Sequence, residues 1–241
     1  GINQRLSDVA NELKRIRQLA KEKKINYLFI LGDIFQDRNR LDIVVLNIIH
    51  REIWRFVKAG IKVILLVGNH DRVGVGTQHA LEVFKDLAVV ADKPTRYDFS
   101  GTKVLAIPFM PEPKDVVKEL KQYGSKADFV IMHTGIKSVE LQPGVPWGEG
   151  IRLKDIPKGL WAFIGHQHRH MRVRKRVYFV GSLLHCDWGD EGQQKYFAEW
   201  DNGKVRFHEA QGPHFIRLRW KEKYWKHTNL EDFSGHFVKI D

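Results

Sequence analysis

Side chains able to bind a metal ion follow four short apolar segments of the sequence. "FILGD" ends in Asp33, "LLVGNHD" in Asn69, His70 and Asp71, "VIMH" in His133, and "AFIGHQH" in His166 and His168. His166 and His168 are two residues apart, so on an extended backbone both point to the same face. Carboxylate, amide and imidazole donors without a thiolate suit Mn²⁺, Fe²⁺ or Zn²⁺ in a catalytic site. Asp33 is also of the type that can bridge two ions.

Each of these positions also has an ordinary structural interpretation. Asp33 is equally well a turn or helix-capping carboxylate, and the run Asn69–Asp71 a polar turn. His133 alone is more often a hydrogen-bonded histidine at a strand edge. The recurrence of such residues after four apolar segments favours the metal site over these separate explanations.

The segments around these residues predict an α/β fold. Leu6, Val9, Leu13, Ile16 and Leu19 form an apolar stripe along a helix over residues 5–24, with Ser7 as a candidate N-cap. A buried strand then precedes a second helix over residues 41–57, and another buried strand follows. This alternation with continuous apolar strands indicates a parallel sheet covered on both faces. Ligands collect beyond the carboxyl ends of such strands, where the candidate residues lie.

The second half of the sequence predicts a different pattern. A hairpin is expected at Ser100–Gly101, followed by a helix over residues 113–123 and an irregular, Gly- and Pro-rich stretch over residues 134–155. From Trp161 onward short strands dominate, which suggests a more antiparallel sheet, and Asp201–Gly203 is a hairpin turn signal.

Composition narrows the class of partner. The 241 residues carry a formal net charge of +11, which favours a polyanionic partner, with nucleic acid ahead of an anionic membrane. A generally basic, well-solvated surface is the alternative. No apolar run reaches membrane-spanning length, and the single Cys186 excludes an internal disulfide. Because the sequence opens with Gly1, a fragment or trimmed chain is expected.

Taken together, the Gly-Asp, Gly-Asn-His-Asp, His and Gly-His-x-His motifs resemble the calcineurin-like metallophosphoesterase superfamily. Within it the chain is most similar to the SbcD-like nuclease subunits of DNA double-strand-break repair, bacterial or phage. The stretches "LGDIFQDRNR", "RLSDVANELKRIRQLA" and "VGSLLHCDWGDEGQQKYFAEW" point to that branch. The resemblance implies an α/β fold in which a β-sandwich of two mixed sheets is flanked by helices. It also implies two divalent ions, with Mn²⁺ expected.

The resemblance assigns roles to particular positions. Asp33 matches the bridging carboxylate, and Asn69, His133 and His166 match the other ligands of one ion. His168 matches a ligand of the other ion. His70 matches the residue that contacts the scissile phosphate and protonates the leaving oxygen, with Asp71 placed to orient it. The family's initial Asp-x-His strand is not found in this sequence, so the first strand is expected to be missing and the chain to be truncated. A chain truncated in this way could be inactive or poorly folded.

Basic residues near the histidine pair are candidate substrate contacts. Arg169, Arg172 and Arg174 lie in "RHMRVRKR", and Arg72 follows Asp71. They could hold a phosphodiester backbone, or protect a solvated edge strand and pair with carboxylates. Trp147 is expected to anchor its own loop, with base stacking as the alternative.

We therefore expect a metallophosphoesterase domain over residues 1–212 and the start of a capping domain over residues 213–241. The predicted function is a metal-dependent DNA nuclease, cytoplasmic in a bacterium or phage-infected cell, with DNA, an SbcC-like ATPase and a second copy as partners. A small-molecule phosphodiesterase, a protein phosphatase of the same superfamily and an inactive DNA-end-binding scaffold remain alternatives.

Overall fold

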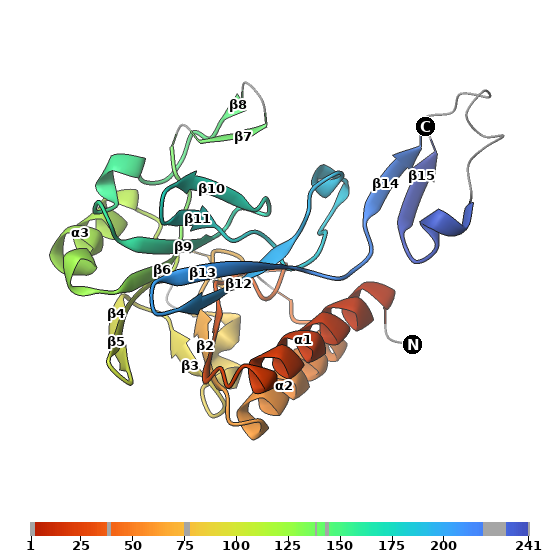
Figure 1. Cartoon of the computed structure of the whole chain (residues 1–241), viewed down its shortest axis with the longest axis horizontal. Helices are drawn as coiled ribbons and strands as arrows, with labels where there is room; N and C mark the ends of the chain where they lie inside the picture. The colour runs from red at the N-terminus through yellow and green to blue at the C-terminus, as the bar shows by residue number, and fades with distance from the viewer. Residues whose placement is uncertain are drawn as a thin grey trace.

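Two β-sheets packed face to face form the centre of the molecule (Figure 1). The computed structural model describes residues 3–37, 40–74, 78–137, 139–142, 145–218 and 230–240. The smaller sheet has three parallel strands in chain order, β1 (Tyr27–Ile30), β2 (Lys62–Leu66) and β3 (Val89–Ala91). Side chains of β2 such as Ile64 and Leu66 pack against Ala106 and Ile131 of the larger sheet, which closes the inner core.

The larger sheet has the strand order β10-β11-β9-β6-β5-β4. Its strands are β4 (Thr95–Phe99), β5 (Thr102–Ile107), β6 (Phe129–His133), β9 (Trp161–Gly165), β10 (Met171–Arg174) and β11 (Val177–Phe179). The four central strands are parallel, and only the edge strands β4 and β10 are antiparallel to their neighbours. The expected antiparallel second half is therefore wrong for β9 and β11, because crossover connections return both strands in the direction of β6.

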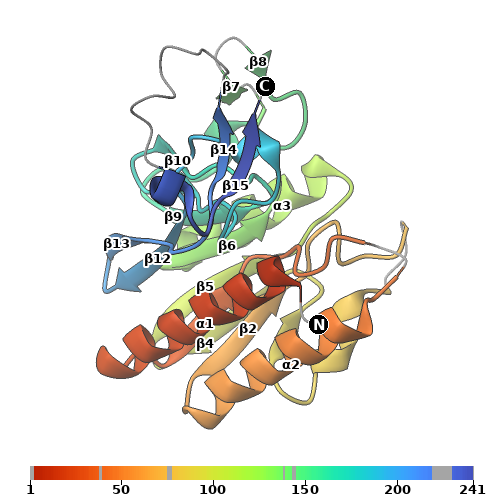
Figure 2. The ribbon, with the colours of Figure 1, turned by 90° about the vertical axis from the view of Figure 1, so that its right-hand side faces the viewer.

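Three helices cover the outer faces of the sandwich. α1 (Gln4–Glu22) and α2 (Ile43–Lys58) lie side by side on the smaller sheet (Figure 2), and α3 (Pro113–Tyr123) packs on the larger one. α1 begins earlier than expected, because its N-cap is Asn3 and not Ser7. The Asn3 side chain accepts a hydrogen bond from the backbone N–H of Arg5. The prediction of an α/β sandwich of two sheets flanked by helices is confirmed. Among the described residues, no helix is long and apolar enough to cross a membrane.

The remaining elements surround this body. β12 (Tyr196–Asp201) and β13 (Lys204–Glu209) form the expected hairpin, with Asn202 and Gly203 both at positive φ in its turn. Two short strand pairs are β7 (Glu140–Gln142) with β8 (Val145–Pro146), and β14 (Phe215–Leu218) with β15 (Phe237–Ile240). Single 3-10 turns are η1 (Ala80–Phe84), η2 (Gly124–Lys126), η3 (Leu153–Asp155), η4 (Trp188–Asp190) and η5 (Leu230–Phe233). The boundary between residues 212 and 213 stays a prediction, although β14 and β15 pair only with each other among the described strands.

β1 forms one edge of the smaller sheet. Within the described part of the chain it pairs with β2 alone, so the backbone groups along its other edge have no partner strand. A cavity of about 1490 Å³ runs beside this edge, and its lining includes Leu28 and Ile30 of β1 and Ala198 and Trp200 of β12. The missing first strand stays a prediction.

A buried carboxylate holds α1 and α2 together. The Glu52 side chain is 1% exposed and lies 2.9 Å from Arg17 Nη1 of α1 and 2.6 Å from Arg55 Nη1 of its own helix. A buried carboxylate of this kind is tolerated only because both guanidinium groups pair with it.

We expect Glu52→Ala to lower the free energy of unfolding by about 3 kcal/mol, because it leaves the Arg17 charge partly buried without its partner. Urea denaturation followed by circular dichroism measures this. The matched control is Arg51→Ala, whose half-exposed side chain lies 4.0 Å from the same carboxylate and should change stability by less than about 0.5 kcal/mol. Equal effects of the two substitutions would contradict the proposed role of Glu52.

Candidate metal centre

The carboxyl ends of four strands meet at one edge of the sandwich. Asp33 follows β1, Asn69 follows β2, His133 ends β6 and His166 follows β9. Asp33, His133 and His166 each offer a ligand atom within 4.8 Å of the others. Asp33 and His166 have φ angles of +55° and +85°, a conformation that costs energy outside glycine and turns the chain sharply at each strand end. The structure thus brings four of the predicted ligands together, while their role as ligands stays a prediction.

Several polar atoms that face one another in this group are hydrogen-bond acceptors. His133 Nδ1 lies 2.6 Å from the Leu31 carbonyl, and since a carbonyl only accepts, Nδ1 carries the proton. In the neutral ring Nε2 is then a lone pair, and it faces Asn69 Oδ1 at 2.9 Å and Asp33 Oδ2 at 3.2 Å. Converging lone pairs repel one another unless a cation lies between them.

Distances within the group agree with shared coordination. Two atoms each about 2.0–2.2 Å from one ion lie roughly 2.8–3.6 Å apart for octahedral or tetrahedral angles. The His166 Nδ1 to Asn69 Oδ1 distance is 2.9 Å, and the two contacts of His133 Nε2 fall in the same range. The donor set therefore fits a divalent transition metal held by Asp33, Asn69, His133 and His166.

Burial keeps His166, and neighbouring groups keep Asp33, in the protonation state that binds metal. Burial, with His133 close by, lowers the pKa of His166 from 6.5 to about 4, so the ring is neutral at physiological pH. Burial alone would raise the pKa of Asp33, but contacts with His133 and with the His70 N–H bring it below its usual value. A neutral imidazole and an ionised carboxylate are the forms a cation requires.

Asp71 organises the two loops that carry the group. Its side chain is fully buried and accepts four backbone hydrogen bonds: from Gly68 at 2.9 Å, and from Asp33, Ile34 and Phe35 at 2.8, 3.0 and 3.2 Å. The loops also approach closely at Gly68, where a Cβ atom would overlap the Asp33 side chain. Asp71 therefore joins the loop after β1 to the loop after β2.

No hydrogen bond between the Asp71 carboxylate and the His70 ring is found among the described residues, so the predicted orientation of His70 by Asp71 stays a prediction. Both carboxylate oxygens of Asp71 are directed at backbone N–H groups, whereas His70 Nδ1 lies 3.0 Å from the Gln36 carbonyl. The His70 backbone N–H donates to Asp33 Oδ1 at 2.8 Å, which places His70 directly beside the ligand group. Sequence analysis missed Gln36 and Leu31 because both act through carbonyl groups, which every residue has.

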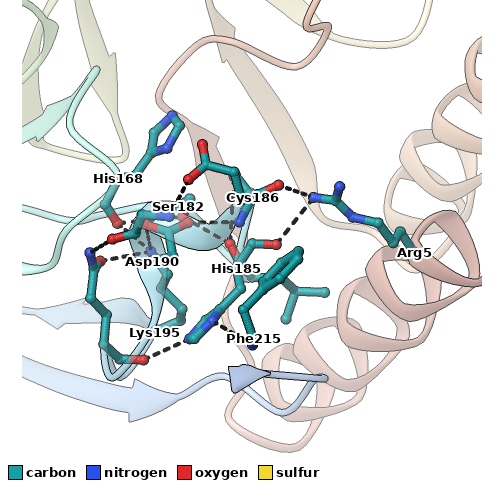
Figure 3. A network of polar contacts seen from close by, with 12 residues as sticks. Arg5, His168, Ser182, His185, Cys186, Asp190, Lys195 and Phe215 are labelled. Atoms are coloured by element: carbon teal, nitrogen blue, oxygen red, sulfur yellow. Dashed lines mark hydrogen bonds and ion pairs between the residues drawn. The ribbon is translucent and has the colours of Figure 1, made fainter. Parts of the chain in front are cut away.

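His168 belongs to a different group of side chains. It is exposed, and its ring lies within 4.8 Å of Cys186 Sγ and the Asp190 carboxylate rather than in the Asp33 group. Figure 3 shows the network that holds its backbone: Lys195 Nζ donates to the His168 carbonyl at 2.8 Å and pairs with Asp190 at 2.8 Å. Both members of this ion pair are 3% exposed. The structure thus brings together the ligands predicted for one ion, while the predicted second ligand pair, Asp33 with His168, stays a prediction.

The segment around residues 182–195 connects this network to distant elements. Arg5 of α1 donates to the carbonyls of His185 and Cys186, and the Phe215 N–H of β14 lies 3.2 Å from His185 Nδ1. His185 Nε2 contacts the Gln193 carbonyl at 2.7 Å. The position of His168 therefore depends on contacts from both ends of the described chain.

The candidate substrate arginines divide into two pairs. Arg72 donates to the Asp92 carbonyl at 3.0 Å, and Arg174 to the carbonyls of Leu153, Ile156 and Pro157 at 3.1–3.4 Å. Their guanidinium groups are thus engaged in holding loops. Arg169 and Arg172 are exposed beside the histidine pair, and a role in substrate binding stays a prediction for them.

Trp147 packs beside the ligand group. Its ring centroid lies 5.9 Å from that of His166, edge to face, and its backbone N–H donates to the Val139 carbonyl at 2.9 Å. This packing agrees with the loop-anchoring interpretation and leaves Trp147 in contact with a candidate ligand.

Comparison with known proteins identifies the family. Residues 3–192 match the family model described as calcineurin-like phosphoesterase. The chain belongs to this family. It is 25% identical to the "DNA double-strand break repair protein Mre11" of Sulfurisphaera tokodaii, over 98% of this chain and 56% of that protein. It is 27% identical to "Exonuclease subunit 1" of Enterobacteria phage T4, over 80% of this chain and 58% of that protein.

Two conclusions follow for this calcineurin-like phosphoesterase domain. The chain spans little more than half the length of the curated relatives it matches. Members of the family use divalent metals, and the acceptor group around Asp33 and His133 fits such an ion.

We expect Asp71→Asn to destabilise the fold by about 3 kcal/mol or more. The amide nitrogen would face two of the four N–H donors, which leaves those groups buried and unsatisfied. Urea denaturation gives the free energy of unfolding, with Asp86→Asn on the exposed surface as the control expected to change little. If Asp71 served mainly to orient His70, the substitution would leave stability near that of the parent chain.

The depressed pKa of His166 predicts a pH-dependent stability. Between pH 6.5 and about 4 the unfolded chain binds a proton on this ring while the folded chain does not. The metal-free protein should therefore lose stability as pH falls through this window, by on the order of 1–3 kcal/mol from this ring. In thermal melts with EDTA at several pH values, Tm should fall less steeply with falling pH for His166→Asn than for the parent chain. Parallel slopes would contradict the assignment.

Proposed function

We propose that this chain carries the catalytic domain of a metal-dependent DNA nuclease that hydrolyses phosphodiester bonds in DNA repair or recombination. The observation that carries the proposal is the convergence of Asp33, Asn69 and His133 acceptor atoms beside His70 in a calcineurin-like phosphoesterase. Support for DNA as the substrate comes from the two relatives, one described as a DNA double-strand break repair protein and one as an exonuclease subunit.

In this proposal one set of residues binds the metal ions, and His70 acts on the leaving group. Asp33, Asn69, His133 and His166 would hold one divalent ion, and Asp33 with His168 would hold another; Mn²⁺ is the ion we expect. When bound, such ions neutralise charge on phosphoryl oxygens and lower the pKa of water. His70, with Nδ1 held by the Gln36 carbonyl, would present Nε2 to the leaving oxygen. Because Nδ1 carries one proton already, His70 donates the Nε2 proton there in its imidazolium form.

Charge favours a polyanionic substrate over a small one. The net charge of +11 raises the local concentration of DNA, and Arg169 and Arg172 are exposed next to the histidine pair, where they can contact phosphates. A small-molecule phosphodiesterase or a protein phosphatase would use the same ligands without needing this charge. A DNA-end-binding scaffold would use the charge without the chemistry.

Partners and compartment remain proposals. An SbcC-like ATPase and a cytoplasmic location follow from the resemblance alone. For a second copy of the chain, one surface is suitable: Ile43, Trp54 and Val57 are 64%, 44% and 36% exposed on one face of α2. Apolar side chains grouped in this way favour contact with another protein surface.

The test is cleavage of end-labelled linear DNA with Mn²⁺, comparing the parent chain with His70→Ala. We expect cleavage that requires the metal and falls by about 10²–10⁴-fold in the variant, because the leaving oxygen loses its proton donor. Circular dichroism and Mn²⁺ binding of His70→Ala serve as controls, since neither should change if His70 is not a ligand.

Other outcomes separate the alternatives. Cleavage undiminished in His70→Ala would contradict the role of His70. Hydrolysis of a phosphate monoester or small diester, with DNA left intact, would favour the second class of enzyme. DNA-end binding that is the same in both chains, with no hydrolysis of any substrate, would favour the scaffold.

A further inference from the structure

A second group of metal-binding side chains lies apart from the Asp33 group. His79 precedes η1, Glu82 lies within it, and Asp92 follows β3. One ligand atom from each lies within 4.8 Å of the other two. Neither the family resemblance nor the motifs of the sequence give these residues a role.

His79 is buried without a hydrogen-bond partner among the described residues. Its side chain is 1% exposed, and neither Nδ1 nor Nε2 makes a hydrogen bond of acceptable geometry to any described atom. Burying an imidazole in this way costs on the order of 1–3 kcal/mol. Compensation has to come from the two carboxylates beside the ring or from a cation that they share with it.

The carboxylates lie where such a ligand would be shared. His79 Nε2 is 3.2 Å from Glu82 Oε1 and 3.5 Å from Asp92 Oδ2. Both distances fall within the roughly 2.8–3.6 Å expected between two ligands of one ion. The side chains of Glu82 and Asp92 are 53% and 34% exposed, so an ion can enter from solvent and keep a water ligand.

One cationic side chain already contacts the carboxylates. Lys85 Nζ lies 2.8 Å from Glu82 Oε1 and 3.5 Å from Asp92 Oδ2. Its side chain is 45% exposed, so moving it into solvent costs little. Lys85 is therefore a competitor for any metal ion at this position.

We propose that His79, Glu82 and Asp92 bind a divalent transition-metal cation of the Zn²⁺ class, at a site separate from the Asp33 group. One nitrogen and two carboxylate oxygens with an open position suit Zn²⁺. The proposal does not depend on nuclease activity.

Such an ion would fix the segment that follows His70. The Ala80 N–H donates to the Asp71 carbonyl at 2.8 Å, the Val73 N–H to the Gln78 carbonyl at 3.1 Å, and Arg72 to the Asp92 carbonyl. Joining His79 to Asp92 would hold this segment against the end of β3. Its role is structural: it ties the His70 loop to the smaller sheet.

The test counts Zn²⁺ sites on the full chain after EDTA stripping and dialysis, by isothermal titration calorimetry. His79→Gln should bind one Zn²⁺ fewer per chain than the parent. His133→Gln should remove a different site, so the double variant should lose both. Glu82→Gln changes an exposed side chain and should leave folding unchanged. It should weaken the same site more than roughly tenfold.

Lys85→Gln gives the sharpest control, because it removes the competitor. We expect it to tighten Zn²⁺ binding at this site several-fold and to enlarge the Zn²⁺-induced rise in Tm, which His79→Gln should abolish. Unchanged stoichiometry in both His79→Gln and Glu82→Gln would overturn the proposal, as would Zn²⁺ binding that is indifferent to Lys85. These results would show a buried ion-paired histidine and nothing more.

Discussion

The candidate metal centre depends on the buried carboxylate of Asp71. An ionised side chain in this position would be costly, and four backbone N–H groups from two loops offset that cost. The same hydrogen bonds fix where those loops leave β1 and β2. The positions of Asp33, Asn69 and His70 therefore depend on the hydrogen bonds by which Asp71 joins the two loops.

The two halves of the predicted active site are supported differently. The Asp33, Asn69, His133 and His166 group sits on strand ends, with the buried β6 and β9 behind it and a backbone carbonyl fixing the His133 ring. His168 lies on a loop whose backbone carbonyl accepts from the buried Lys195, which pairs with Asp190. Arg5 of α1 contacts the neighbouring segment at the carbonyls of His185 and Cys186. Rigid strand ends favour a preorganised set of side chains, whereas a loop position supported by an ion pair is more easily adjusted.

Side-chain contacts change the role that can be assigned to several basic residues near the site. Arg72 and Arg174 donate to carbonyls of neighbouring loops, so they stabilise the surroundings of the site rather than extend a free positive surface. Arg169 and Arg172 keep the exposure that a phosphate contact needs. The proposed role of the net charge in DNA binding therefore involves fewer side chains near the site than the sequence suggested.

The sequence by itself determined the helices, most strands and the convergence of ligands. The apolar stripe of α1, the continuous apolar runs of β2 and β6, and the Asn202–Gly203 turn are local signals, because burial and turn geometry select side-chain types at fixed spacing. Ligand convergence followed from the rule that parallel strands end at one edge.

Only the tertiary structure decided the strand order, the partners of Asp71 and His70, and the meeting of His79 with Glu82 and Asp92. Strand order depends on crossover connections, which made β9 and β11 parallel to β6. Backbone N–H and C=O groups are the same in every residue, so no side-chain pattern could show that Asp71 binds four of them or that Gln36 orients His70. The His79 group could not be predicted for a related reason. Asp92 lies near His79 and Glu82 because β3 pairs with β2, and that pairing is a result of folding.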